Sequence, residues 1–197
     1  MKKIQYILST LFLAVMAVSC SQDMDIDNNQ GYLSLKVSSL VSTQDPGTRA
    51  AAPANYDPKT LHVEIQNDKG VVVKSTDNFA TDEEFQGNIL LEAGYYTIVA
   101  HSANWDGNGS GFDVPYYYGS TKILVEPKSA KKAEVTCTLA NVKLTVNYDQ
   151  SFVEAFKSAT TTINSTLNGI SPLQFVMKET TRSGYIPAEP FYAAINV

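Results

Sequence analysis

The chain has 197 residues, of which 44% are hydrophobic, so it can bury the core of one or two domains. Its formal net charge is −5, and the sequence contains no long basic run. Because proteins bind nucleic acids through concentrated positive charge, we expect no nucleic-acid partner.

The first twenty residues have the pattern of a bacterial lipoprotein signal. Two lysines precede an apolar run at residues 7–18, and a small residue, Ser19, stands before Cys20. The run is too short to cross a bilayer, so we expect residues 1–19 to be a signal peptide that is removed. Cys20 would then carry the lipid and tether the protein to a membrane outside the cytoplasm. An ordinary secretory signal with an incidental cysteine is the alternative.

A polar, acidic stretch at residues 20–30 follows the signal and lacks apolar periodicity, which predicts a flexible tether. Its three aspartates, Asp23, Asp25 and Asp27, resemble the surface-export signal of Bacteroidota-type lipoproteins. A simple solvated linker explains them equally well.

Alternation of apolar and polar residues then predicts a series of strands. We expect strands at residues 32–41, 61–65, 71–73, 88–92, 95–101, 121–125, 132–139 and 142–148. The turn residues at 67–70 predict a hairpin, and residues 151–158 predict one short helix with Ser151 as its cap. This spacing is typical of an antiparallel β-sandwich.

We expect an N-terminal β-sandwich domain at residues 31–140 and a partial C-terminal β domain at 141–197. The second domain offers three strands and the helix, and its last apolar run is at residues 191–197. Such a domain is either small and irregular, or cut short by a truncated reading frame, or built so that its last strand pairs elsewhere.

Residues with catalytic or metal-binding potential are few. If Cys20 is lipidated, Cys137 has no disulfide partner, and its strand pattern predicts a buried thiol. The two histidines, His62 and His101, lie in no metal-ligand motif. We therefore expect no enzymatic activity, no metal and no cofactor.

Aromatic residues gather around a Gly-rich segment that we interpret as a turn. They are Trp105, Tyr116, Tyr117 and Tyr118. Exposed rings of this kind stack on sugars, which makes these four residues candidate glycan contacts. Packing of alternate rings on the edge of the sandwich is the alternative, and the one we favour.

Several short motifs, in this order, resemble the fimbrillin-like lipoproteins of Bacteroidales. They are residues 31–35, 48–50, 91–96, Trp105, 112–119 and 137–142. The resemblance implies transthyretin-like β-sandwich domains, the second incomplete here, and a lipoprotein exposed at the outer membrane. It also implies that an arginine-specific protease cuts after Arg49, in the long loop at residues 42–58. The strand at 32–41 would then leave, and a strand from another subunit would fill its place.

The sequence thus predicts a surface structural protein: a fimbrial subunit, tip or anchor that assembles with itself or with other fimbrial subunits. A surface glycan-binding lipoprotein is the alternative. A monomeric surface lipoprotein that only presents loops also fits the sequence.

Overall fold

The computed structural model describes residues 27–40, 60–102, 109–179 and 182–197. Cys20, Arg49 and Trp105 lie outside these residues. The strands are β1 (Gln30–Ser39), β2 (Leu61–Asn67), β3 (Val72–Thr76), β4 (Asn88–Glu92), β5 (Gly94–Ser102), β6 (Gly111–Phe112), β7 (Tyr117–Val125), β8 (Ala130–Leu139), β9 (Asn141–Leu144), β10 (Thr160–Ser165), β11 (Leu173–Val176), β12 (Gly184–Pro187) and β13 (Phe191–Asn196). The helices are α2 (Glu83–Gln86) and α3 (Gln150–Ala155). None of the described helices is long and apolar enough to span a membrane.

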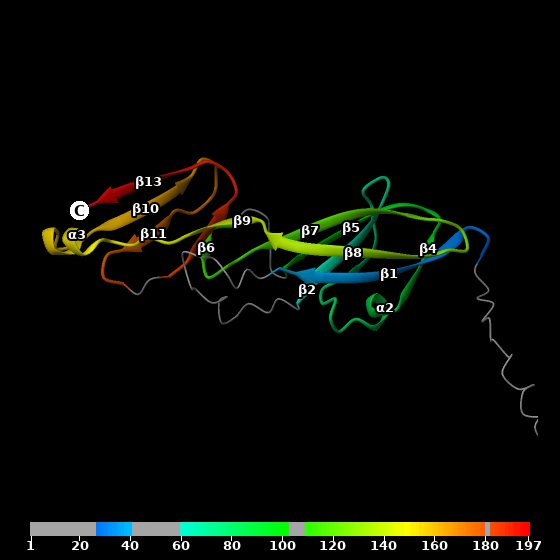
Figure 1. Cartoon of the computed structure of the whole chain (residues 1–197). Helices are drawn as coiled ribbons and strands as arrows, with labels where there is room; N and C mark the ends of the chain where they lie inside the picture. The colour runs from blue at the N-terminus through cyan, green and yellow to red at the C-terminus, as the bar shows by residue number, and fades with distance from the viewer. Residues whose placement is uncertain (1–26, 41–59, 103–108, 180–181) are drawn as a thin grey trace, which may run out of the picture.

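The first sandwich is one sheet that folds over on itself, with strand order β3-β2-β5-β7-β8-β1-β4 (Figure 1). Its fold line is the junction of β7 and β8, which pair only at Tyr117–Leu139 and Tyr118–Thr138. The strands on either side of this junction therefore form two layers. The all-β sandwich predicted from alternation is confirmed.

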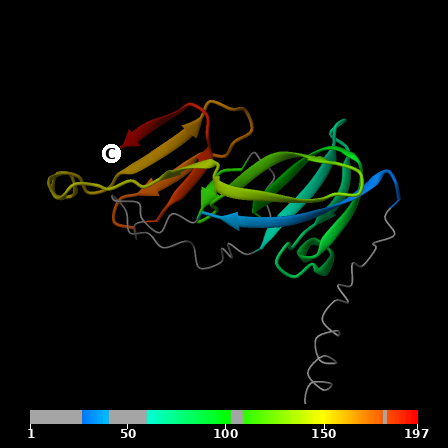
Figure 2. The same cartoon turned by 45° about the vertical axis from the view of Figure 1, so that its right-hand side comes forward.

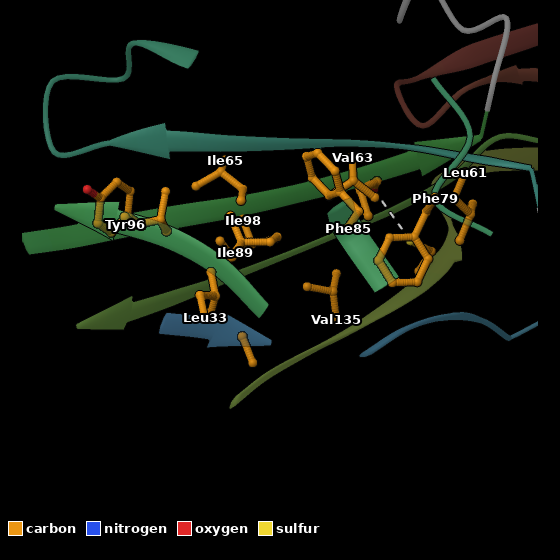
Figure 3. Close-up of a cluster of buried hydrophobic side chains, with 14 of the residues drawn as sticks. Leu33, Leu61, Val63, Ile65, Phe79, Phe85, Ile89, Tyr96, Ile98 and Val135 are labelled. Atoms are coloured by element: carbon orange, nitrogen blue, oxygen red, sulfur yellow. Dashed lines mark hydrogen bonds between the residues drawn. The ribbon is translucent and has the colours of Figure 1, made fainter. Parts of the chain in front are cut away.

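The two layers enclose one apolar core (Figure 3). Its fully buried side chains come from both layers: Leu33, Val63, Ile65, Phe85, Ile89, Ile98, Val125, Val135 and Cys137. Apart from Phe85, which comes from the helix α2, they are the residues that alternation places on one face of each strand, because successive side chains of a strand point to opposite sides of the sheet.

One strand departs from the expected antiparallel pattern. β1 pairs antiparallel with β4 but parallel with β8. Parallel neighbours need a long crossover connection, and here β2 to β7 separate β1 from β8 in sequence. β1 is thus inserted between two strands that come much later in the chain.

The expected β2–β3 hairpin is confirmed, but the short helix α2 was not predicted. Asp82 caps it by accepting hydrogen bonds from the backbone N–H groups of Glu84 (3.0 Å) and Phe85 (3.2 Å). The helix inserts the Phe85 ring into the core, where it is 1% exposed. A helix of four residues is too short to produce a recognisable period.

The second sandwich packs the sheet β11-β10-β13 against the sheet β6-β12-β9 (Figure 2). Ile163, Leu173, Phe175 and Ile186 form its buried centre. The sequence places β6 within residues 31–140, yet β6 pairs with β12 and so belongs to this second unit.

Two local predictions in this region were wrong. Asp149, not Ser151, caps α3, because the Asp149 carboxylate accepts a hydrogen bond from the Ser151 backbone N–H at 2.8 Å. The strand predicted at residues 142–148 ends at Leu144, where its pairing with β12 ends. Alternation continues beyond it because Val146 still packs against the apolar cluster.

Candidate functional site

The most distinctive site in the described chain is the slot that holds β1. On one side β8 pairs with β1 from Tyr32–Ala130 to Ser39–Cys137. On the other side β4 pairs with β1 only from Gln30–Glu92 to Ser34–Asn88. The N-terminal half of β1 (residues 30–34) therefore pairs with β4 and, from Tyr32 on, also with β8, whereas the C-terminal half (residues 35–39) pairs with β8 among the described residues.

The side chains of β1 complete the core of the first sandwich. Leu33 is 0% exposed, and Leu35 and Val37 are partly buried against the same cluster. The side chains on the two flanking strands are Ile89, Leu91, Ala133, Val135 and Cys137. If β1 left, these side chains and the facing backbone edges of β4 and β8 would lose their cover and their ladder partners.

Polar contacts tie the N-terminal end of β1 to its neighbours. The side-chain amides of Asn29 and Gln30 donate to the two carboxylate oxygens of Glu92, at 3.0 and 2.8 Å. The Gln30 carbonyl accepts a hydrogen bond from the Lys128 backbone N–H at 2.7 Å. The N-terminal end of β1 is thus connected both to β4 and to the turn between β7 and β8.

The other end of β1 borders a cavity of about 370 Å³. Val37, Leu61, Phe79, Ala80 and Gln86 contribute to its lining, and we call it the β1 cavity. Figure 3 shows Leu61 and Phe79 together at one end of the core. Beyond it, the side chain of Leu40 is 61% exposed, and the chain continues into residues 41–59, where Arg49 lies.

Cys137 faces this core, and the prediction that its thiol is buried is confirmed. Its sulfur donates to the Ala100 carbonyl at 3.4 Å. Burial raises the pKa of the Cys137 thiol to about 11, so it stays protonated at neutral pH. The described chain thus holds this cysteine as a structural side chain.

The predicted aromatic contacts do not form one surface. Tyr117 is 6% exposed and belongs to the core, and Tyr116 is 7% exposed. Burial raises the pKa of Tyr116 to about 12. Only Tyr118 of the three presents a large part of its ring, at 40% exposure.

A cluster around His62 was not anticipated from the sequence. The two ring nitrogens of His62 lie 3.0 Å from Asp77 Oδ1 and 3.3 Å from Glu64 Oε1. The ring of His101, its cross-strand neighbour, is 4.7 Å away. The His62–His101 contact follows from the β2–β5 register, which the sequence alone does not give. Within the described residues, no group of histidine, cysteine or acidic side chains is arranged to hold a metal ion.

The pKa of Glu64 is lowered, chiefly because the Gln66 amide donates to its carboxylate at 2.8 Å. His62 adds to this effect by hydrogen bonding and by charge. The cluster therefore fixes the ring of His62 between two acidic side chains on the outer face of the sheet.

Comparison with solved structures places the fold among proteins of Bacteroides. A "putative adhesin" from Bacteroides ovatus has a TM-score of 0.50 and 12% identity, with 85% of this chain and 72% of that chain covered. A structure from Bacteroides thetaiotaomicron VPI-5482, described as "putative polysaccharide binding proteins (DUF1812)", has a TM-score of 0.43 and 9% identity, with the same coverage.

These similarities concern the fold. None of the curated proteins compared with the chain is significantly similar to it in sequence. A family model does match most of the described chain, over residues 29–194. The chain therefore belongs to the family described as "Domain of unknown function (DUF4493)".

Proposed function

We propose that this protein is an adhesin-like lipoprotein of the bacterial cell surface, held in the outer membrane through Cys20. It serves as a subunit, tip or anchor of a fimbria-like polymer. In this proposal a protease cuts after Arg49, β1 leaves its slot, and a strand from another subunit replaces it. The fold similarity to the Bacteroides ovatus protein and the resemblance to fimbrillin-like lipoproteins support the surface role.

The observation that carries the proposal is the position of β1. It is the first strand of the described chain, yet it lies between β8 and β4 and contributes Leu33 to the centre of the core. A terminal strand in such a slot can be exchanged for an equivalent strand without any rethreading of the chain. Its loss would expose an apolar groove and unpaired backbone groups, and strand addition removes both costs.

Arginine content makes a direct test practical. The sequence contains two arginines, Arg49 and Arg182, so an arginine-specific protease has two cleavage sites. We expect limited digestion of the intact lipoprotein to produce a new N-terminus at Ala50 and to start assembly into species that resist mild denaturant. Arg49→Lys should block both, and Arg182→Lys should block neither.

The readouts are N-terminal sequencing and a denaturing gel run with and without heating. Polymers of normal size from the Arg49→Lys variant would contradict the role of this site. If the polymerised subunits on cells still begin at the lipidated Cys20, β1 has not been lost, and this result would contradict the proposal.

A glycan-binding role is the second candidate, and one observation favours it. The rings of His62, His101, Tyr116 and Tyr118 form a row with neighbouring centroids 4.7, 6.1 and 6.4 Å apart, in which Tyr116 is buried. Tyr118 offers the exposed end of this row. Tyr118→Ala should weaken retardation of the protein in gels that contain polysaccharide, and Tyr95→Ala is the control. An unretarded wild-type protein across a broad glycan panel would end this proposal.

A further inference from the structure

We infer that the second sandwich carries a binding pocket for an acidic sugar, namely one uronic acid residue of a glycan. The inference goes beyond the proposed function, because it requires neither cleavage after Arg49 nor strand exchange. The pocket has a volume of about 280 Å³. It lies where α3 and the segment that leads into α3 face β11 and the turn after β11, and we call it the α3 pocket.

Aromatic and aliphatic side chains form walls of the α3 pocket. The ring of Tyr148 is fixed by its hydroxyl group, which lies 2.7 Å from Thr161 Oγ1 and donates to the Phe175 carbonyl oxygen at 2.8 Å. Val146 and Val153 add aliphatic surface. A ring that is already held in place can pack against the C–H face of a sugar without a further loss of side-chain freedom.

Arg182 brings one positive charge to this lining. Its guanidinium carbon lies 3.4 Å from the centroid of the Phe112 ring. Its Nη2 atom donates to the Gln174 carbonyl at 3.4 Å and forms the ion pair with Glu179 at 3.5 Å. The Nε and Nη1 atoms of Arg182 have no partner among the described residues. A guanidinium group has five N–H donors, so several remain for a ligand.

Lys178 brings the second positive charge. Its Nζ atom donates to the Lys157 carbonyl at 3.3 Å, so the side chain reaches across to the chain that follows α3. A planar guanidinium and an ammonium group in one pocket are well suited to bind a carboxylate, because charge-assisted hydrogen bonds are stronger than neutral ones.

Charge and size together select the ligand class. Residues 141–197 contain as many basic as acidic side chains, so this part of the chain is formally neutral, whereas the whole chain has a net charge of −5. A phosphate would use the two cations but leave the aromatic wall uncovered. A hexuronate has a carboxylate for the cations, a C–H face for the ring of Tyr148, and hydroxyl groups for Asn147 and Glu179. The small volume suits one such residue of a longer glycan.

The place of the pocket in the molecule fits contact with a glycan. α3 lies at one end of the molecule, and the start of β1 lies at the other (Figure 1, Figure 2). A lipid anchor that precedes β1, as proposed for Cys20, would leave the α3 pocket at the opposite end, away from the anchor.

Titration of the full chain with uronates tests the ligand class. The probes are short oligomers of glucuronic, galacturonic and mannuronic acid, and their methyl esters serve as uncharged controls with the same rings. We expect calorimetry to detect binding of at least one acid, and its ester to bind about ten-fold more weakly because a charge-assisted hydrogen bond is lost. No binding of any acid, or equal binding of acid and ester, would overturn the inference.

Substitutions test the location. Lys178 has a φ angle of 73°, a conformation that asparagine adopts more readily than lysine, so Lys178→Asn removes the charge without disturbing the backbone. Lys178→Asn and Arg182→Gln should each weaken binding of the uronate about ten-fold. Lys157→Asn is the matched control: the Lys157 side chain is not part of the lining, and its contact with Lys178 uses the backbone carbonyl. An equal loss in Lys157→Asn would indicate general charge attraction and overturn the site.

Further variants separate this site from the functions proposed above. Tyr118→Ala and Arg49→Lys should bind the uronate as wild type does, since Tyr118 belongs to β7 of the first sandwich and Arg49 is required for assembly alone. Loss of binding in Tyr118→Ala would move the site to the first sandwich and overturn this inference. Triglutamate that binds as tightly as the uronate would replace the sugar by an acidic peptide. Failure of the uronate test would leave assembly through β1 untouched.

Discussion

Gly31 of β1 lies against the backbone of Glu126, in the turn that joins β7 to β8, so closely that an added Cβ would come within 2.4 Å of the Glu126 carbonyl oxygen. The same Cβ would lie 2.9 Å from a methyl group of Val125. Glycine is therefore required here for space, since any other side chain would push β1 away from the end of β7 and the β7–β8 turn.

The first prediction concerns this contact. Gly31→Ala should lower the free energy of unfolding by about 3 kcal/mol, because the backbone of the turn cannot move without disturbing Val125 in the core. Chemical denaturation measures the change. Gly94→Ala is the matched control, since its Cβ would meet nothing closer than Tyr96 Cε2 at 4.0 Å. Equal losses in the two variants would show that the close approach is unimportant.

The second prediction concerns Cys137. Burial raises its pKa to about 11, so the thiol should resist iodoacetamide at pH 8 in the folded protein and react once the protein is unfolded. The experiment uses a chain with Cys20→Ser, so that Cys137 is the only thiol. Mass spectrometry reports the modification. Rapid labelling under native conditions would mean that the slot beside β1 opens readily even without cleavage.

The third prediction concerns Asn141, a side chain 5% exposed at the start of β9. Its oxygen accepts a hydrogen bond from the Tyr116 N–H at 3.1 Å, and its amide donates to the Val114 carbonyl at 3.0 Å. Asn141→Asp keeps the acceptor but places a carboxylate oxygen against the Val114 carbonyl. We expect a loss of about 2 kcal/mol at pH 7, measured by denaturation.

Acid provides the internal control for this variant. When the new carboxyl group is protonated, it can donate to the Val114 carbonyl, so the stability deficit relative to wild type should shrink at low pH. If the loss in free energy of unfolding of Asn141→Asp is the same at all pH values, its cause is packing and not the charge of the carboxylate.

The fourth prediction follows from the lowered pKa of Glu64. A carboxyl group whose pKa is lower in the folded state stabilises the fold above its unfolded pKa, near 4.5, and this contribution disappears as the pH falls through the folded pKa. Gln66→Leu removes the main hydrogen bond to Glu64 and should raise the pKa of Glu64 toward its ordinary value. NMR titration of the Glu64 carboxyl group measures it.

Gln66→Leu should also reduce stability at pH 7 and have no such effect once Glu64 is protonated in both proteins. If Glu64 has the same pKa in Gln66→Leu as in wild type, His62 rather than Gln66 is the cause of the lowered pKa. Asp77→Asn then serves as the comparison, because it alters the other partner of His62 and leaves Gln66 in place.

Alternation along the sequence identified most strands of the first sandwich and the side that each strand buries. For example, it placed Cys137 on an apolar face, and the structure has Cys137 at 0% exposure. Alternation also predicted that β9 continues through residues 145–148. The strand ends earlier because its hydrogen-bonded pairing with β12 ends at Leu144. The cap of α3 was likewise assigned two residues late.

The candidate site was predicted only in part. The sequence indicated that residues 32–41 form a strand, whereas its position between β8 and β4 depends on partners such as Glu134, 98 residues away from Lys36. Likewise, three consecutive tyrosines look alike in the sequence, but pairing with β8 and the fold of the sheet put Tyr117 in the core and leave Tyr118 exposed.

The sequence by itself determined the β-rich character of this protein and the apolar faces of its strands, because a period of two is a local property of the chain. Tertiary structure alone decided which strands meet. Register, the parallel insertion of β1, the closeness of Gly31 to Glu126 and the cavity beside Val37 all arise from contacts between residues far apart in the chain. Such contacts depend on the packing of whole layers, and no local pattern encodes them.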